Sequence, residues 1–239
     1  MPLVTFVRHG ESVCNEALLR KMMNVAEKND LEMLSTGECS KRHGGNPALT
    51  STGERQAKEA GKHLVDQLLN NIEWNLTRPE DGTYRNWKKH PPRCLFLCSD
   101  LDRAVQTANL ALAEACKHVR WMKKEVPFLR LRPDLREHTD REEDTFGLEK
   151  SEYDANLDSF VIELQGMEGE FDHVFVFCHS NVMKSVMQRM DNQGGTRLSV
   201  FNGGLITMKN SPPENLKILR LFEVEVEIIN HRKRWWWQH

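Results

Sequence analysis

Three short apolar runs mark the chain at widely separated places. They lie at residues 3–7, 94–98 and 174–178, and none of them contains a charged residue. Continuous apolar runs of this length are typical of strands buried on both faces, as in a parallel sheet. The pattern therefore predicts three inner strands of a mostly parallel sheet.

Helical periodicity fills the intervals between these runs. The first predicted helix begins at Ser51, which forms a capping-box pattern with Glu54, and its apolar face continues to Leu68. A second predicted helix begins near Ser99, and a third follows residue 179. Because strand and helix signals alternate, we expect an α/β fold, namely a three-layer α/β/α sandwich with a mostly parallel central sheet.

The rest of the chain lacks this alternation of strand and helix patterns. Apolar residues alternate with glutamates at 222–228, which predicts a half-exposed strand at a sheet edge. Two polar stretches, 17–48 and 70–93, have the character of inserted loops. We therefore expect a single domain over residues 1–230, followed by a basic, tryptophan-rich tail at 231–239.

Charge and cysteine content narrow the classes of partner and compartment. The 33 lysines and arginines are balanced by 35 aspartates and glutamates, for a net charge of -2. Nothing in this balance favours nucleic acid or an anionic membrane as a partner. Any anion-binding site therefore has to depend on a few cationic residues gathered in one place. The six cysteines contain no Cys-x-x-Cys pair, and no signal peptide accompanies them. We expect reduced thiols and a cytoplasmic location.

Polar residues gather where the apolar runs end. The first run leads into Arg8, His9 and Gly10. The second leads through a helix start to Arg103, and the third ends at His179. Parallel strands bring their carboxyl ends to one edge of a sheet, where α/β proteins bind ligands. Guanidinium groups bind phosphate oxygens and a neutral imidazole offers a nucleophilic nitrogen, so the sequence predicts a phosphate site at this edge.

Several ordered motifs resemble the histidine phosphatase superfamily, whose members share the phosphoglycerate mutase-like fold. The motifs are Arg8-His9-Gly10-Glu11-Ser12 with Asn15, residues 49–57, residues 103–108, Leu135-Arg136-Glu137 and the strand-terminal His179. The resemblance spans most of the chain. One departure is that many members have glycine after the second histidine, whereas Ser180 stands there in this chain.

The resemblance implies a role for each matching residue. The phosphate-binding residues would be Arg8, Asn15 and Arg103, and the catalytic residues would be His9, Glu137 and His179. His9 would become phosphohistidine, and Glu137 would protonate the leaving oxygen and then activate water. No metal or other cofactor is implied, because the arginines supply the positive charge. The sequence also contains no His-x-x-x-His or His-Glu-x-x-His spacing.

Hydrolysis of phosphate monoesters is the function that we predict, with a small phosphorylated molecule or a phosphopeptide as substrate. Mutases carry an aromatic-glycine segment after the acidic motif, whereas residues 138–145 are rich in acidic residues and unlike it. Phosphoglycerate mutase activity, or an inactive binding module of the same fold, remain the alternatives. We predict no nucleic-acid partner and leave the oligomeric state open.

The carboxyl end combines cations with aromatic rings. Residues 231–239 place three cations beside three consecutive tryptophans. Such a segment could lie at a membrane interface or dock on a partner. Nine residues offer too little surface for a stable membrane anchor, so we expect the indole rings to pack back on the protein.

Overall fold

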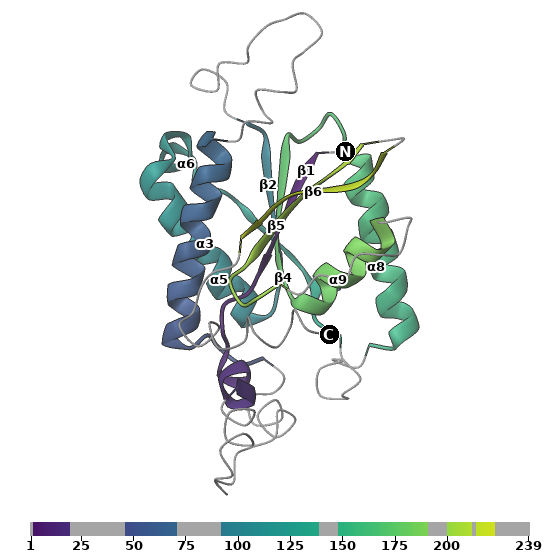
Figure 1. Ribbon diagram of the computed structural model, residues 1–239, viewed down its shortest axis with the longest axis horizontal. Helices are drawn as coiled ribbons and strands as arrows, with labels where there is room; N and C mark the ends of the chain where they lie inside the picture. Colours follow the sequence, from purple (N-terminus) through teal and green to yellow (C-terminus); the bar gives the residue numbers. More distant parts are fainter. Residues whose placement is uncertain are drawn as a thin grey trace, which may run out of the picture.

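A single sheet crosses the molecule, with helices on both of its faces (Figure 1). The computed structural model describes residues 2–19, 46–70, 92–138, 148–190, 200–211 and 214–222. Its strands are β1 (Leu3–Arg8), β2 (Cys94–Ser99), β3 (Leu129–Arg132), β4 (His173–Cys178), β5 (Leu205–Ser211) and β6 (Glu214–Phe222). Its named helices are α3 (Ser51–Asn70), α5 (Asp102–His118), α6 (Arg120–Lys124), η1 (Pro133–Leu135), α8 (Lys150–Gly166) and α9 (Ser180–Met190).

The strands form one sheet in the order β3-β2-β4-β1-β5-β6. β1 pairs with β4, β4 with β2, and β2 with β3, in each case in parallel. β5 and β6 continue the sheet in antiparallel orientation. The three apolar runs of the sequence therefore form three adjacent inner strands, and the predicted mostly parallel sheet is confirmed.

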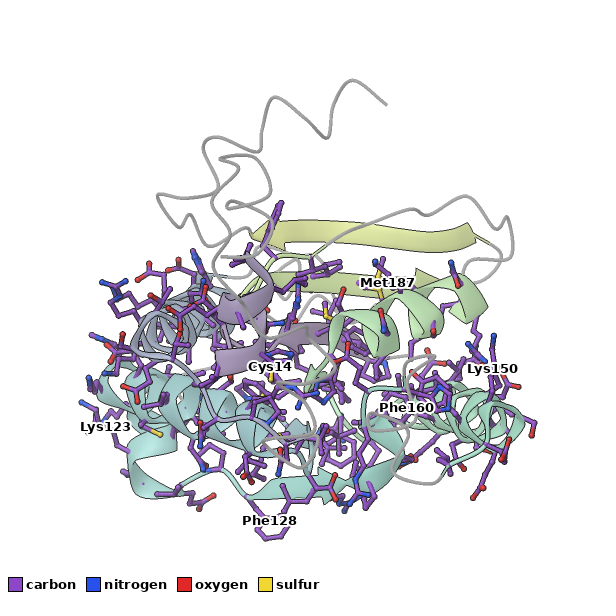
Figure 2. All side chains as sticks on the ribbon, turned by 90° about the horizontal axis from the view of Figure 1, so that it is seen from below. Cys14, Lys123, Phe128, Lys150, Phe160 and Met187 are labelled. Carbon is purple, nitrogen blue, oxygen red and sulfur yellow. The ribbon has the colours of Figure 1, made fainter. Side chains whose placement is uncertain are left out.

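Side chains from both faces of the sheet are buried under helices. α3 and α5 cover one face, and α8 and α9 cover the other (Figure 1). Along β4, Val174 and Val176 belong to the core under α8 and α9, whereas Phe175 and Phe177 belong to the core under α3 and α5. Figure 2 shows the side chains between the sheet and its helices, with Phe160 labelled in α8. The predicted three-layer sandwich is confirmed, and its two buried faces explain why the inner strands contain so few polar residues.

The first helix begins as predicted, but a different residue caps it. The Thr50 hydroxyl oxygen accepts a hydrogen bond from the Gly53 amide at 3.0 Å, so Thr50 is the N-cap and Ser51 is the first helical residue. The predicted capping box of Ser51 and Glu54 is therefore wrong, because the N-cap is the preceding residue. The Thr50 hydroxyl also donates to Glu11 Oε1 at 2.7 Å, which ties the helix start to the loop after β1.

Six of the named elements were not predicted from the sequence. They are β3, β5, β6, α6, α8 and the short η1. β3 has the sequence Leu-Arg-Leu-Arg at the sheet edge, so it lacks the continuous apolar run of the inner strands. The buried residues of α8 do recur at helical spacing, from Tyr153 through Leu157 and Phe160 to Leu164, so its signal is present in the sequence.

Several predicted features lie outside the described residues. These are most of the loops at 17–48 and 70–93, the alternating segment beyond Phe222, and the tail at 231–239. Residues 17–19 belong to a helix over residues 13–19. Within the described residues, no helix combines the length and the apolar character that crossing a membrane requires.

One cysteine contradicts the expectation of reduced thiols throughout. Cys14 is disulfide-bonded. Cys94, Cys98, Cys116 and Cys178 are free. Burial raises the pKa of the Cys98 and Cys178 thiols, so these two are inert packing residues of the inner strands.

A cluster of buried polar side chains joins three neighbouring strands on the face of the sheet that α3 covers. The Thr5 hydroxyl donates to Gln67 Oε1 at 2.8 Å, and it lies 2.7 Å from His173 Nε2 and 2.9 Å from the Thr207 hydroxyl. A hydroxyl has a single proton, so His173 Nε2 and Thr207 must donate to Thr5. Burial lowers the pKa of His173 to about 3, and the ring stacks on Phe175 with centroids 3.9 Å apart. His173 is therefore a neutral part of the core.

We predict that His173 makes the protein less stable as the pH falls below 6.5. The unfolded histidine has a pKa of about 6.5 and the folded one about 3, so the unfolded state binds the proton more readily. The loss is absent above pH 6.5, grows as the pH falls toward 3, and amounts to about 3 kcal/mol at pH 4.5. Urea unfolding of the wild type and His173→Gln between pH 4.5 and 7.5 measures it. The stability difference between the two proteins should change by that amount, and parallel pH profiles would contradict the assignment.

Candidate active site

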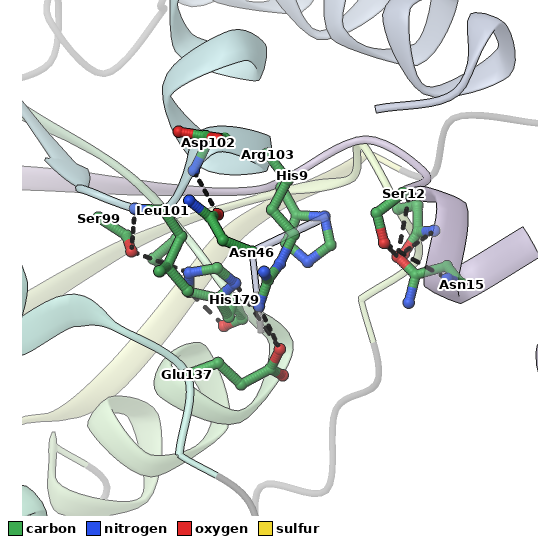
Figure 3. A network of polar contacts seen from close by, with 12 residues as sticks. His9, Ser12, Asn15, Asn46, Ser99, Leu101, Asp102, Arg103, Glu137 and His179 are labelled. Atoms are coloured by element: carbon green, nitrogen blue, oxygen red, sulfur yellow. Dashed lines mark hydrogen bonds and ion pairs between the residues drawn. The ribbon is translucent and has the colours of Figure 1, made fainter. Parts of the chain in front are cut away.

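The carboxyl ends of three adjacent parallel strands bring the predicted residues together. His9 directly follows β1, His179 directly follows β4, and β2 ends at Ser99. These strands are neighbours in the order β2-β4-β1, so their ends meet at one edge of the sheet. Figure 3 shows His9, His179 and Arg103 at this edge, with Glu137 facing them.

His9 is held in one position and one tautomer. Its Nδ1 lies 2.7 Å from the Gly10 carbonyl oxygen, and since a carbonyl only accepts, Nδ1 has to carry the proton. Burial lowers the pKa of His9 well below its usual value, and the positive charges of Arg103 and Arg8 lower it further. The ring is therefore neutral near pH 7, and Nε2 has a free lone pair.

The loop after β1 is packed too tightly for a side chain at Gly10. The Gly10 amide donates to the Thr107 hydroxyl at 3.0 Å, and a Cβ at Gly10 would collide with the Gly53 carbonyl oxygen. Thr107 in turn donates to the Arg103 carbonyl oxygen at 2.7 Å. The start of α5 and the start of α3 therefore fix the backbone that carries His9.

Two arginines place positive charge around the histidines. Arg8, the last residue of β1, donates from Nη1 to the Val200 carbonyl oxygen at 2.6 Å. Burial lowers the pKa of Arg8. The negative charge of Glu137 raises this pKa in part, and the positive charge of Arg103 lowers it. Arg103 lies in the first turn of α5, is 6% exposed, and donates from Nη2 to Glu137 Oε2 at 3.2 Å. An anion at this edge would meet both guanidinium groups.

The second histidine is also neutral and buried. His179 Nε2 lies 2.9 Å from the Ser99 hydroxyl, and its Nδ1 lies 3.7 Å from Glu137 Oε2. Burial lowers the pKa of His179 well below its usual value, with the charges of Arg103 and Arg8 adding to the effect. The rings of His9 and His179 are 5.1 Å apart between centroids, so one phosphoryl group could contact both.

Glu137 is the more accessible of the predicted catalytic groups. Its side chain is 22% exposed, against 0% for His179, and it follows η1 on the α8 side of the site. Arg136, next to it, forms two short hydrogen bonds with Asp100, at 2.6 and 2.7 Å. Because Asp100 follows β2, this pair fixes the segment that carries Glu137 to the sheet edge.

Asn15 lies to one side of His9, next to Ser12 (Figure 3). Its Oδ1 accepts hydrogen bonds from the Ser12 amide at 3.2 Å and the Ser12 hydroxyl at 3.0 Å. Asn202 Nδ2 also donates to this oxygen, at 3.4 Å. With Oδ1 occupied as an acceptor, the amide nitrogen is the atom of Asn15 that could donate to a phosphate oxygen.

Two groups of supporting residues were missed by the sequence analysis. Ser99 appeared there only as a helix start, yet its hydroxyl contacts His179. Glu11 and Gln56 belong to motifs that were recognised, but their roles were not assigned. The Glu11 amide donates to Gln56 Oε1 at 2.7 Å, which fastens the loop after His9 to α3. A polar residue at a strand end, as Ser99 is, was the available signal.

The site also offers atoms that could ligate a metal ion. His9, Glu137 and His179 each contribute one such atom, and these atoms all lie within 4.8 Å of one another. However, Arg103 contacts Glu137, and the positive charges of the two arginines already lower the pKa of both histidines. A cation would be repelled by the same guanidinium groups that would attract a phosphate. The electrostatics therefore favour an anionic ligand.

No protein-family model and no curated protein matches the sequence. Solved structures do match along nearly the whole chain. Alpha-ribazole phosphatase from Shigella flexneri is 15% identical, with 94% of this chain and 98% of that chain covered and a TM-score of 0.54. Phosphoserine phosphatase from Entamoeba histolytica, solved with 3-phosphoglyceric acid, is 13% identical, with coverages of 94% and 98% and a TM-score of 0.54.

A third match is the mycobacterial glucosyl-3-phosphoglycerate phosphatase, solved with VO3. It is 14% identical, covers 94% of this chain and 100% of its own, and has a TM-score of 0.52. At identities this low, the three matches show that the fold is shared.

Proposed function

We propose that this protein, which has the phosphoglycerate mutase-like fold of the histidine phosphatases, hydrolyses phosphate monoesters through a phosphohistidine at His9. One observation carries the proposal. His9 is neutral, its proton is fixed on Nδ1 by the Gly10 carbonyl oxygen, and the buried Arg103 and the partly buried Arg8 lie near it. A nucleophile of this kind beside preplaced positive charge is what phosphoryl transfer requires.

In the first step, His9 Nε2 attacks the phosphorus atom. A bond forms between Nε2 and phosphorus while the bond between phosphorus and the leaving oxygen breaks. Arg8 and Arg103 neutralise the negative charge on the phosphoryl oxygens, and the amide nitrogen of Asn15 adds a hydrogen bond. His179 donates to the same group from Nδ1, which requires the Ser99 hydroxyl, 2.9 Å from Nε2, to donate to that nitrogen.

Glu137 acts on the leaving group and then on water. An arriving phosphate competes with Glu137 for Arg103, which releases the carboxyl group to take up a proton. Glu137 passes that proton to the leaving oxygen as the alcohol departs. In the second step, Glu137 takes a proton from water, the water oxygen attacks phosphorus, and the bond to Nε2 breaks. Phosphate leaves, and neutral His9 returns.

The reaction so described involves no metal ion, since the arginines supply the positive charge. The substrate is a small phosphorylated molecule or a phosphopeptide. A mutase would use the same first step but would return the phosphoryl group to a second hydroxyl of the substrate. A phosphoglycerate incubated with a bisphosphorylated cofactor separates the two activities, because a mutase alone gives an isomerised product.

Replacement of His9 by alanine should lower kcat by more than about a thousand-fold, because the attacking atom is lost. Activity is measured as phosphate released from 4-nitrophenyl phosphate. Rapid quenching of the wild type should trap a phosphoenzyme that is labile in acid and stable in base. His118→Ala, which removes a histidine on the exposed end of α5, is the matched control and should keep full activity. Full activity in His9→Ala would exclude the mechanism.

Replacement of Glu137 by glutamine should slow alkyl phosphates by about a hundred-fold or more, because their leaving oxygens need a proton. Aryl phosphates with good leaving groups should lose much less. The comparison uses kcat for glycerol phosphate and for 4-nitrophenyl phosphate, with the exposed Glu125→Gln as control. An equal loss for both esters would show that Glu137 only binds.

EDTA should leave both wild-type rates unchanged, and a loss restored by added metal would contradict a metal-free reaction.

A further inference from the structure

A cavity of about 350 Å³ lies beside Glu137, on the side of η1 and α8. The residues that line it are Pro133, Asp134, Arg136, Glu137, His138, Leu148, Tyr153 and Asn156. Glu137 is shared between this cavity and the cluster of His179 and Arg103. In the proposed function Glu137 protonates the leaving oxygen, so the group attached to that oxygen has to lie next to Glu137. The cavity is therefore placed to receive the leaving group.

The charged side chains of the lining already have partners. Asp134 accepts two hydrogen bonds from Arg132, at 2.6 and 2.9 Å, and Arg136 is paired with Asp100 at 2.6 Å. Glu137 is paired with Arg103 at 3.2 Å. The lining contains the carboxylates of Asp134 and Glu137 and the guanidinium group of Arg136, so without substrate its own charge is negative.

This arrangement disfavours a second anionic group in the substrate. Asp100 already accepts hydrogen bonds from Nε and Nη2 of Arg136 and offsets its charge, and such a group would lie close to the carboxylate of Asp134. The paired Arg136 therefore offers a second anion little attraction, and the carboxylates of Asp100 and Asp134 repel it.

The remaining lining residues suit a flat and largely apolar group. The rings of His138 and Tyr153 stack with centroids 4.9 Å apart and planes tilted by 22°, and Pro133 and Leu148 complete the apolar part of the lining. The His138 ring is fixed by a 3.0 Å hydrogen bond from Nε2 to the Leu148 carbonyl oxygen. Asn156 adds an amide that can pair with an uncharged polar substituent. The volume is within the range of small-molecule sites, at the lower end of about 300–1,000 Å³.

We propose that this cavity binds the leaving group, and that it selects phosphate monoesters of uncharged, ring-containing alcohols over esters whose leaving group carries a second anion. The proposal rests on the proposed phosphatase function and adds the substrate class. It also distinguishes this chain from a mutase, whose phosphoglycerate substrate carries a carboxylate.

Two isosteric esters test the selectivity. They are 4-carbamoylphenyl phosphate and 4-carboxyphenyl phosphate, which have the same ring and differ in the charge of one substituent. The value of kcat/KM should be at least tenfold higher for the carbamoyl ester. Equal values, or a preference for the carboxylate, would overturn the proposal.

A pair of variants on α8 locates the selectivity in the cavity. Asn156→Lys adds a cation to the lining and should reduce the preference for the carbamoyl ester by at least threefold. Ile162→Lys adds the same charge at a position on α8 that is 69% exposed and outside the lining, and it should leave the preference unchanged. An equal change in both variants, or none in Asn156→Lys when its thermal unfolding matches that of the wild type, would show that the leaving group binds elsewhere.

A binding measurement tests the selectivity of the cavity without turnover. Calorimetric titration of His9→Ala with each ester should give a lower Kd for the carbamoyl ester. If the two esters bind equally, the substrate class is wrong even though a phosphoenzyme forms in the wild type. If the wild type forms no phosphoenzyme with either ester, the proposed function fails instead, and the inference fails with it.

Discussion

The hydrogen bond between His9 Nδ1 and the Gly10 carbonyl oxygen is the constraint on which the site depends. It fixes the ring proton on the nitrogen that faces the backbone and leaves the lone pair on the other nitrogen. The bond requires Gly10 to lie against Gly53, with its amide on Thr107. Those residues come from α3 and α5, so the two helices on one face of the sheet determine the tautomer of a residue at its edge.

The electrostatics of the site follow from its burial. His9 and His179 are almost completely buried next to two guanidinium groups, and both imidazoles are therefore held neutral. A neutral histidine adds no positive charge, so the arginines remain the cations that an incoming phosphate meets. Glu137 supplies a counter-charge to Arg103 in the unliganded protein and is exposed enough to exchange protons with water. The same carboxyl group could then serve both as a proton donor and as a base.

The parts of the structure that follow from buried strands could be predicted from the sequence. His9 and His179 were found because they follow apolar runs, and Arg103 because it lies at the helix start after the second run; parallel strands bring these ends together. Glu137 follows no such run, so its place depended on the resemblance to a known family. The role of Ser99 was missed because a polar residue at a strand end does not reveal which side chain it contacts, and its contact with His179 spans 80 positions of the chain. The disulfide at Cys14 was missed because composition and spacing favoured free thiols.

Nitrogen NMR of the histidine rings tests the central claim most directly. Protein labelled with 15N at histidine is titrated from pH 8 to pH 6, and the His9 signals are assigned by their loss in His9→Ala. The account predicts a protonated Nδ1 and an unprotonated Nε2 for His9 throughout this range, because burial and the two arginines lower its pKa well below 6.5. A His9 ring that takes up a proton with a midpoint near 6.5, or that carries its proton on Nε2, would contradict it.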